Sequence, residues 1–198
     1  PDSPDTTGYK TLIPVMSFKK INVPFSADTL KLINSKVEYE EINEKTGLTG
    51  NILVNRLNAA FVNVRNANAP PDDSLTITAS AYLNDVLLTK LEVAQSYADT
   101  SGGFKMQLQI DGADMTKLNP SLKPLALAEI KSVQMDTLYM FVTGNDDHAY
   151  GKMKMVYKDL KVTLYKMKNG KLVSPGFFNF LGNFIINNKN KSFSMVYF

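Results

Sequence analysis

Residues 151–171 read GKMKMVYKDLKVTLYKMKNGK, a ribbon in which lysines alternate with methionine, tyrosine, valine and leucine. Alternation with a period of two places one set of side chains on each face of a β-strand. About 15 residues at ~3.3 Å each give a strand roughly 50 Å long, well beyond the usual 5–6 residues. The apolar residues change parity between Tyr157 and Leu160, so one face stays apolar only if the strand bulges near Lys158 and Asp159. The ribbon therefore predicts a long, one-sided antiparallel strand.

Similar runs with a period of two occur along most of the chain. The clearest hairpin passes through Asn84 and Asp85, a two-residue link suited to the primed turns that join antiparallel strands. Asn34 and Ser35 indicate a kink or bulge inside an earlier run. The fold class is therefore mainly β, with a long curved antiparallel sheet. The strands before the ribbon are expected near residues 29–42, 51–64, 75–83, 86–94, 104–110 and 130–143.

Two short helices interrupt the β pattern. The first is expected near residues 115–128, where Asp114 can cap a turn of helix while Pro120 and Pro124 prevent a long one. The second is expected near residues 176–186. A helix that caps the open sheet is favoured over one that anchors the chain to a membrane surface. The apolar stripe of this second helix consists of Phe177, Phe180, Leu181, Phe184 and Ile185.

The length and composition limit the classes of protein to which the chain can belong. Its 198 residues are expected to form a flexible arm or leader over residues 1–20 and a single β-rich domain over residues 21–198. Because the chain begins at Pro1, we expect it to be a piece of a longer protein. No run approaches the ~20 apolar residues of a membrane-spanning helix. The absence of cysteine excludes disulfides and thiolate chemistry.

The sequence contains no pattern typical of a catalytic centre. His148 is the only histidine, and its neighbours Asp146 and Asp147 point in different directions on a turn, so neither a metal site nor a serine hydrolase is expected. There is no phosphate-binding loop or dinucleotide fingerprint. The net charge of +3 is mild, and the ribbon's lysines are spaced like the wet face of a strand, so nucleic acid is not an expected partner. We therefore expect no enzyme, no cofactor and no metal.

Five stretches follow one another between about Pro24 and Asn190. They are ADTLKLINSKVEYEE (27–41), GLTGNILVNRLNAAFVNV (47–64), MTKLNPSLKPLALAEIKS (115–132), TGNDDHAYGKMKMVYKDLKVTLY (143–165) and FFNFLGNFIINN (177–188). The order of these motifs resembles the AsmA-like proteins of Gram-negative envelopes. This resemblance implies a periplasmic region of an inner-membrane-anchored protein, with the anchor outside this chain. It also implies an elongated antiparallel sheet curled into a groove with an apolar interior, and a role in lipid transport or outer-membrane homeostasis.

A concave face of leucine, isoleucine, methionine and valine can shield lipid acyl chains from water, at ~0.8 kcal/mol per buried methylene. The resemblance therefore implies acyl chains or a membrane surface as partners, together with other envelope proteins. The same apolar face can instead be packed shut by the helices, and the domain would then be a structural or protein-interaction scaffold. The candidate lining residues of the groove are Leu108, Ile110, Leu138, Met140, Val142, Met153, Met155 and Tyr157.

Overall fold

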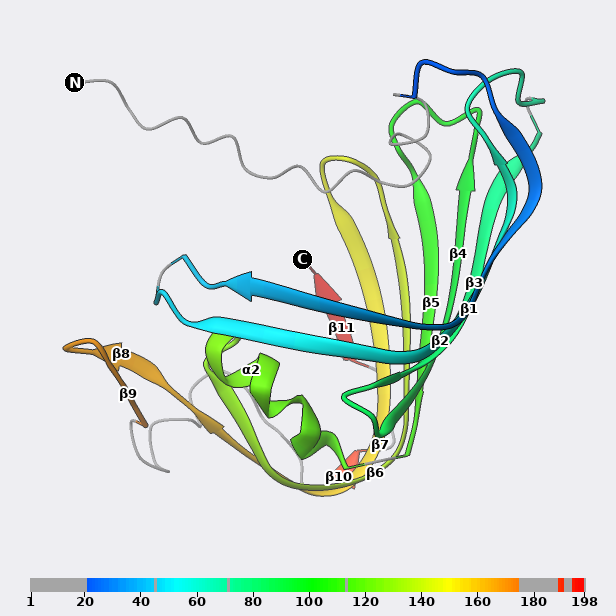
Figure 1. Ribbon diagram of the computed structural model, residues 1–198. Coiled ribbons are helices and arrows are strands. Elements are labelled where there is room, and N and C mark those ends of the chain that lie inside the picture. The colour runs from blue at the N-terminus through cyan, green and yellow to red at the C-terminus, as the bar shows by residue number, and fades with distance from the viewer. Residues whose placement is uncertain are drawn as a thin grey trace, which may run out of the picture.

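The computed structural model describes residues 21–44, 46–70, 72–112, 114–174, 189–190 and 194–197. It is mainly β, and strands β1 to β7 each pair antiparallel with the next along the chain (Figure 1). The expected arm over residues 1–20 and the expected helix near 176–186 lie outside the described residues. The strands are β1 (Ser26–Ile42), β2 (Thr49–Arg65), β3 (Ser74–Leu83), β4 (Leu87–Ser96), β5 (Phe104–Asp111), β6 (Ala128–Gly144) and β7 (Ala149–Leu164).

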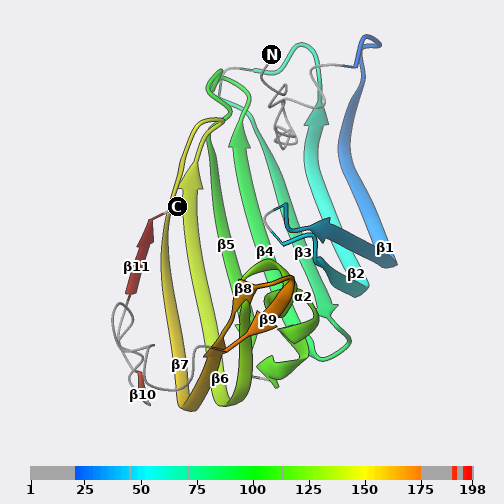
Figure 2. The ribbon, with the colours of Figure 1, turned by 90° about the vertical axis from the view of Figure 1, so that its left-hand side faces the viewer.

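Backbone irregularities bend the longest strands. The β1–β2 register shifts around Asn34 (φ 46°), and the β2–β3 register shifts around Arg56 (φ 51°). The β6–β7 register shifts opposite Asp159, which also has a positive φ of 53°. Both bulges expected from the sequence are confirmed. As a result, β1–β2 and β6–β7 bend toward the same side, and the open sheet is curved (Figures 1 and 2). We call this side the hollow side and the opposite surface the outer face.

The expected hairpin between β3 and β4 is confirmed, but Leu83 pairs with Leu87, so three residues rather than the expected two link the strands. Asn84 and Asp85 both have positive φ, 47° and 66°, as a type I′ turn requires. The Val86 amide donates to the Leu83 carbonyl (3.2 Å), which closes the turn. The side chain of Asn84 adds two bonds, because its Oδ1 accepts from the Leu53 amide (3.0 Å) and its Nδ2 donates to the Lys117 carbonyl (2.7 Å). The turn therefore joins β2, β3–β4 and the helical segment.

The helical segment, η1 (Met115–Leu118) and α2 (Asn119–Leu125), lies on the hollow side (Figure 1). It confirms the helix expected near 115–128, although Leu127 with a φ of 52° marks an earlier end. The side chain of Asn119 exchanges two hydrogen bonds with the backbone of Ile130 on β6 (2.8 and 2.9 Å). At the other end, the side chain of Asn43 donates to the Leu125 carbonyl (3.0 Å). The helix therefore connects the β1–β2 end of the sheet to β6.

Buried side chains form two clusters on the hollow side. The upper cluster joins strands β2 and β3 to Tyr97, and the lower cluster joins β4, β5 and β6 to Met115 of η1. Met115 belongs to the helical segment, which lies on the hollow side. Its place in the lower cluster therefore puts that cluster on the hollow side of the sheet. The upper cluster consists of Val64, Leu75, Ile77 and Tyr97, and the lower cluster of Leu87, Ile110, Met115, Met135 and Leu138.

The chain leaves the main sheet after β7 and forms a separate hairpin, β8 (Lys166–Lys168) and β9 (Lys171–Val173). Asn169 and Gly170 both have positive φ, 51° and 71°, at its turn. Residues 151–171 therefore do not form one continuous strand. Two further strands, β10 (Lys189–Asn190) and β11 (Ser194–Tyr197), pair with β7 and cover part of its edge.

Candidate functional site

One continuous row of apolar residues crosses all seven long strands on the hollow side. Its members are direct partners in successive antiparallel ladders, so their side chains lie on the same face. The row contains no charged or polar side chain. At ~4.8 Å per strand it is about 29 Å long, compared with about 15 Å for the hydrocarbon of one bilayer leaflet. This middle row consists of Leu32, Ala59, Ala79, Leu91, Leu108, Met140 and Met153.

The middle row is less buried than the rows beside it. Leu32 is 40% exposed and only Ala59 is buried, whereas the other members are half-buried. The adjacent rows contain Ile77 and Val142 on one side and Ile110 on the other, all of which are buried. The middle row is therefore a partly accessible apolar strip between two better-packed regions of the hollow side.

The eight residues expected to line a groove all lie on the hollow side, but their exposure differs. Ile110, Leu138, Val142 and Tyr157 are buried. The helical segment explains part of this burial, because Met115 and Leu118 pack with Ile110 and Leu138. The remaining four, which are half-buried, are Leu108, Met140, Met153 and Met155.

The half of the middle row on β1 to β4 was not among the expected lining residues. Leu32 belongs to an alternating run, but the bulge at Asn34 obscured which parity faces inward. Ala59 and Ala79 are too small to stand out as lining residues, and only the ladder register places them beside Leu91. The five apolar residues of the second expected helix, Phe177, Phe180, Leu181, Phe184 and Ile185, lie outside the described residues.

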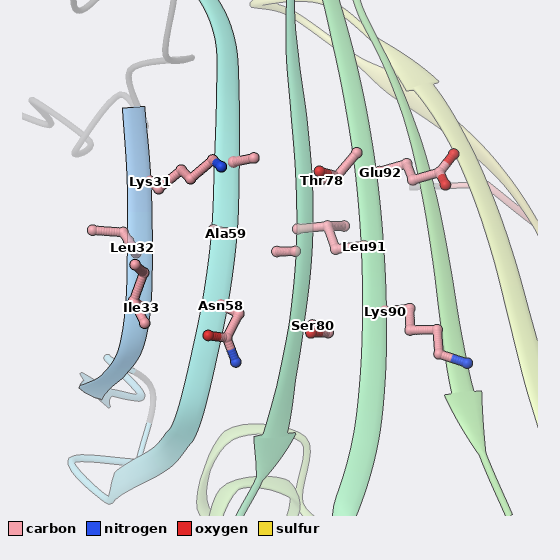
Figure 3. A pocket seen from close by; sticks show the side chains of 12 residues that line it. Lys31, Leu32, Ile33, Asn58, Ala59, Thr78, Ser80, Lys90, Leu91 and Glu92 are labelled. Carbon is pink, nitrogen blue, oxygen red and sulfur yellow. The ribbon is translucent and has the colours of Figure 1, made fainter. Parts of the chain in front are cut away.

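A second hollow, of about 480 Å³, lies over the same strands on the outer face. Figure 3 shows Lys31, Thr78 and Glu92 along one line across the strands, and their direct pairing through Ala60 confirms that they share a face. A second line crosses the same strands and includes Lys90, whose Nζ lies 3.3 Å from a carboxylate oxygen of Asp111. Apolar residues share the lining of this hollow, because Ile33, Ala60 and four members of the middle row (Leu32, Ala59, Ala79 and Leu91) also border it.

Two titratable side chains of the described residues have well-defined neighbours. Hydrogen bonds from Gln109 and then Lys90 hold the pKa of Asp111 below its ordinary value, but this carboxylate is on the outer face. The ring of His148 packs edge-on against Tyr150, with 5.1 Å between the ring centroids. Among the described residues, no three histidine or carboxylate side chains are grouped closely enough to bind a metal ion.

Within the same described ranges, no helix combines the length and the apolar character needed to cross a bilayer. No protein-family model, curated protein or solved structure significantly matches the chain.

Proposed function

We propose that this chain is a noncatalytic cell-envelope domain that binds or shields lipid acyl chains, as part of a longer AsmA-like protein. The observation that carries this proposal is the middle row, which is apolar, uninterrupted and partly accessible. The assignment to the periplasm and to lipid transport or outer-membrane homeostasis rests on the resemblance of the motif order to AsmA-like proteins.

The physical chemistry of the middle row suits an acyl chain. An extended hydrocarbon is apolar along its whole length, so a strip without any polar group is its natural complement. Met140 and Met153 at one end have flexible, polarisable side chains that adapt to an irregular ligand. Ala59 and Ala79 leave space above the backbone of β2 and β3. A chain that lies along this strip would cover side chains that are half-buried in the free domain.

The first test is native mass spectrometry of the purified domain, combined with solvent extraction and lipid analysis. We expect stoichiometric phospholipid or fatty acid, either from the preparation or after incubation with vesicles. A clean mass that remains unchanged after this incubation would contradict the proposal. It would favour the alternative function, a structural or protein-interaction scaffold with a closed apolar face.

A pair of neighbouring substitutions locates the ligand. Met140 lies in the middle row, whereas Phe141 follows it on the outer face and is 41% exposed. We expect Met140→Gln to reduce the bound lipid and Phe141→Gln to leave it unchanged. Because Met140→Gln also carries a risk of unfolding, Leu32→Gln provides a second variant at a more exposed position of the row. If the Phe141 and Leu32 variants lost equal amounts of lipid, the ligand would not lie along the middle row.

A further inference from the structure

The β8–β9 hairpin, residues 166–173, stands apart from the main sheet, and we call it the basic finger. It forms its own two-stranded sheet. When the hollow side faces the viewer, the basic finger lies in front of α2 (Figure 2). It is therefore on the side of the molecule where the middle row is accessible.

The basic finger has an unbalanced charge. Lys166, Lys168 and Lys171 are all exposed, and no Asp or Glu occurs between residues 160 and 174. Within the described part of the chain, none of the three lysines forms an ion pair with a carboxylate. Their three charges equal the formal net charge of the whole chain, +3.

The pairing within the basic finger adds a second observation. Lys168 and Lys171 are direct partners across the two strands, and like charges in directly opposed positions destabilise a β-ladder. An anionic surface beside this pair would remove the repulsion. Between the lysines, Met167 pairs with Leu172, and both are half-buried. Because side chains alternate along a strand, Met167 and Leu172 lie on the opposite face of the hairpin from the lysines, so the ammonium groups of all three lysines share one face. On that face the lysine stems can lie along the surface while the ammonium groups reach anionic headgroups.

We propose that the basic finger docks on the anionic headgroups of a phospholipid membrane and brings the hollow side next to the lipid. The choice of a membrane rests on the proposed lipid-binding function. It also rests on the hairpin itself, because residues 166–173 contain no aromatic residue on which a nucleic-acid base could stack.

Vesicle co-sedimentation tests the docking. The protein would be mixed with vesicles of phosphatidylglycerol and phosphatidylcholine, or of phosphatidylcholine alone, at about 0.1 M salt, where the Debye length is about 10 Å. We expect binding to the anionic vesicles only. The triple variant Lys166→Gln, Lys168→Gln and Lys171→Gln should bind roughly a hundredfold more weakly, since each lysine near an anionic surface contributes about a factor of five.

A second triple variant controls for net charge. Lys31→Gln, Lys105→Gln and Lys152→Gln remove the same charge from exposed positions on the outer face of the main sheet. We expect this variant to retain most of the vesicle binding. Equal losses from the two triples would overturn the proposal, as would equal binding to neutral vesicles. If the basic-finger variant lost binding to duplex DNA but kept its vesicle binding, the result would overturn the membrane-docking proposal in favour of nucleic acid.

Lipid analysis of the basic-finger variant separates the two proposals. Unchanged vesicle binding by this variant, with normal lipid loading, would overturn the docking proposal and leave the acyl-chain proposal standing. Absence of loaded lipid from the wild type, with vesicle binding that depends on the basic finger, would overturn the acyl-chain proposal and support the docking surface alone.

Discussion

Among the described residues, Glu129 is a charged group held by three neighbouring side chains. Its carboxylate accepts hydrogen bonds from Lys131 (2.6 Å) and from the Tyr165 hydroxyl, and Lys123 lies 3.3 Å away. These donors, with Lys131 the largest cause, hold the pKa of Glu129 at about 2, below its ordinary value of 4.5. The carboxylate therefore links α2, which carries Lys123, to the end of β7.

We expect Glu129→Gln to lower the free energy of unfolding at neutral pH by about 1 kcal/mol, a modest amount because solvent screens ion pairs near the surface. Since the folded-state pKa of Glu129 lies below the unfolded-state value, the stabilisation is fully present above pH 4.5 and is lost as the pH falls toward 2. Urea titrations of wild type and variant should therefore converge over this interval. As a control, Glu92→Gln on the exposed outer face should have the same free energy of unfolding as the wild type at every pH. A difference between Glu129→Gln and the wild type that does not depend on pH would contradict the assignment of the effect to the Glu129 carboxylate.

Asn84 combines a left-handed backbone with two side-chain hydrogen bonds, and two substitutions separate these contributions. Asn84→Gly removes the side-chain bonds but accepts the φ of 47° without strain. Asn84→Ala removes the same bonds and adds the strain, so it should be less stable than Asn84→Gly by about 1 kcal/mol. Chemical denaturation of both variants measures the difference. Equal stabilities would show that the turn relaxes away from its left-handed conformation.

At the scale of elements, the attachment of α2 depends on a close approach to β2. A Cβ at Gly50 would lie 2.5 Å from Cγ of Leu125, so a side chain at this position would displace the helix. We expect Gly50→Ala to destabilise the protein by about 1–3 kcal/mol, as overpacking does. In the Leu125→Ala background the same substitution should cost much less, because the clash is absent. An equal cost in both backgrounds would assign the effect to the strand backbone.

The strands and their bulges could be predicted from the sequence because period-two alternation and its phase changes are local signals. The change of parity between Tyr157 and Leu160 indicated the bulge at Asp159, and Asn84-Asp85 indicated the β3–β4 turn. The break before β8 was missed because Lys166 and Met167 continue the alternation of β7. The Asn169-Gly170 pair, a strong hairpin signal, could have revealed it.

The position of the helical segment and the composition of the middle row could not be predicted in the same way. The contact of Leu125 with Gly50 joins residues that are distant in the chain, and no local pattern encodes it. The middle row depends on ladder register, which two bulges shift before Ala59 meets Ala79. The predicted lining residues on β5 to β7 were easier to identify, because β5 and its neighbours alternate regularly.

For the whole molecule, the two edges of the sheet differ. Among the described strands, β1 pairs only with β2, whereas β7 also pairs with β10 and β11. The free edge carries the exposed residues Lys36, Glu38 and Glu40, and charges on an edge strand discourage pairing between molecules.

We expect Lys36→Thr, Glu38→Thr and Glu40→Thr together to cause self-association, because threonine favours a strand and removes the repulsive charges. Light scattering should show an average mass that rises with protein concentration above that of the wild type. Lys90→Thr with Glu92→Thr removes charges from β4, a strand paired on both sides, and should not have this effect. If both variants self-associated, the cause would be the reduced surface charge rather than the loss of charges from the β1 edge.

The methionines of the hollow side also expose the domain to oxidation. Met140 and Met153 are half-buried direct partners at one end of the middle row, and the half-buried Met155 follows in the adjacent row. Peroxide converts a thioether to a sulfoxide, which is polar and chiral, and methionine sulfoxide reductases reverse the change. Oxidant stress would thus make this end of the middle row polar without any change of sequence. Enzymatic reduction of the sulfoxides would restore its apolar surface.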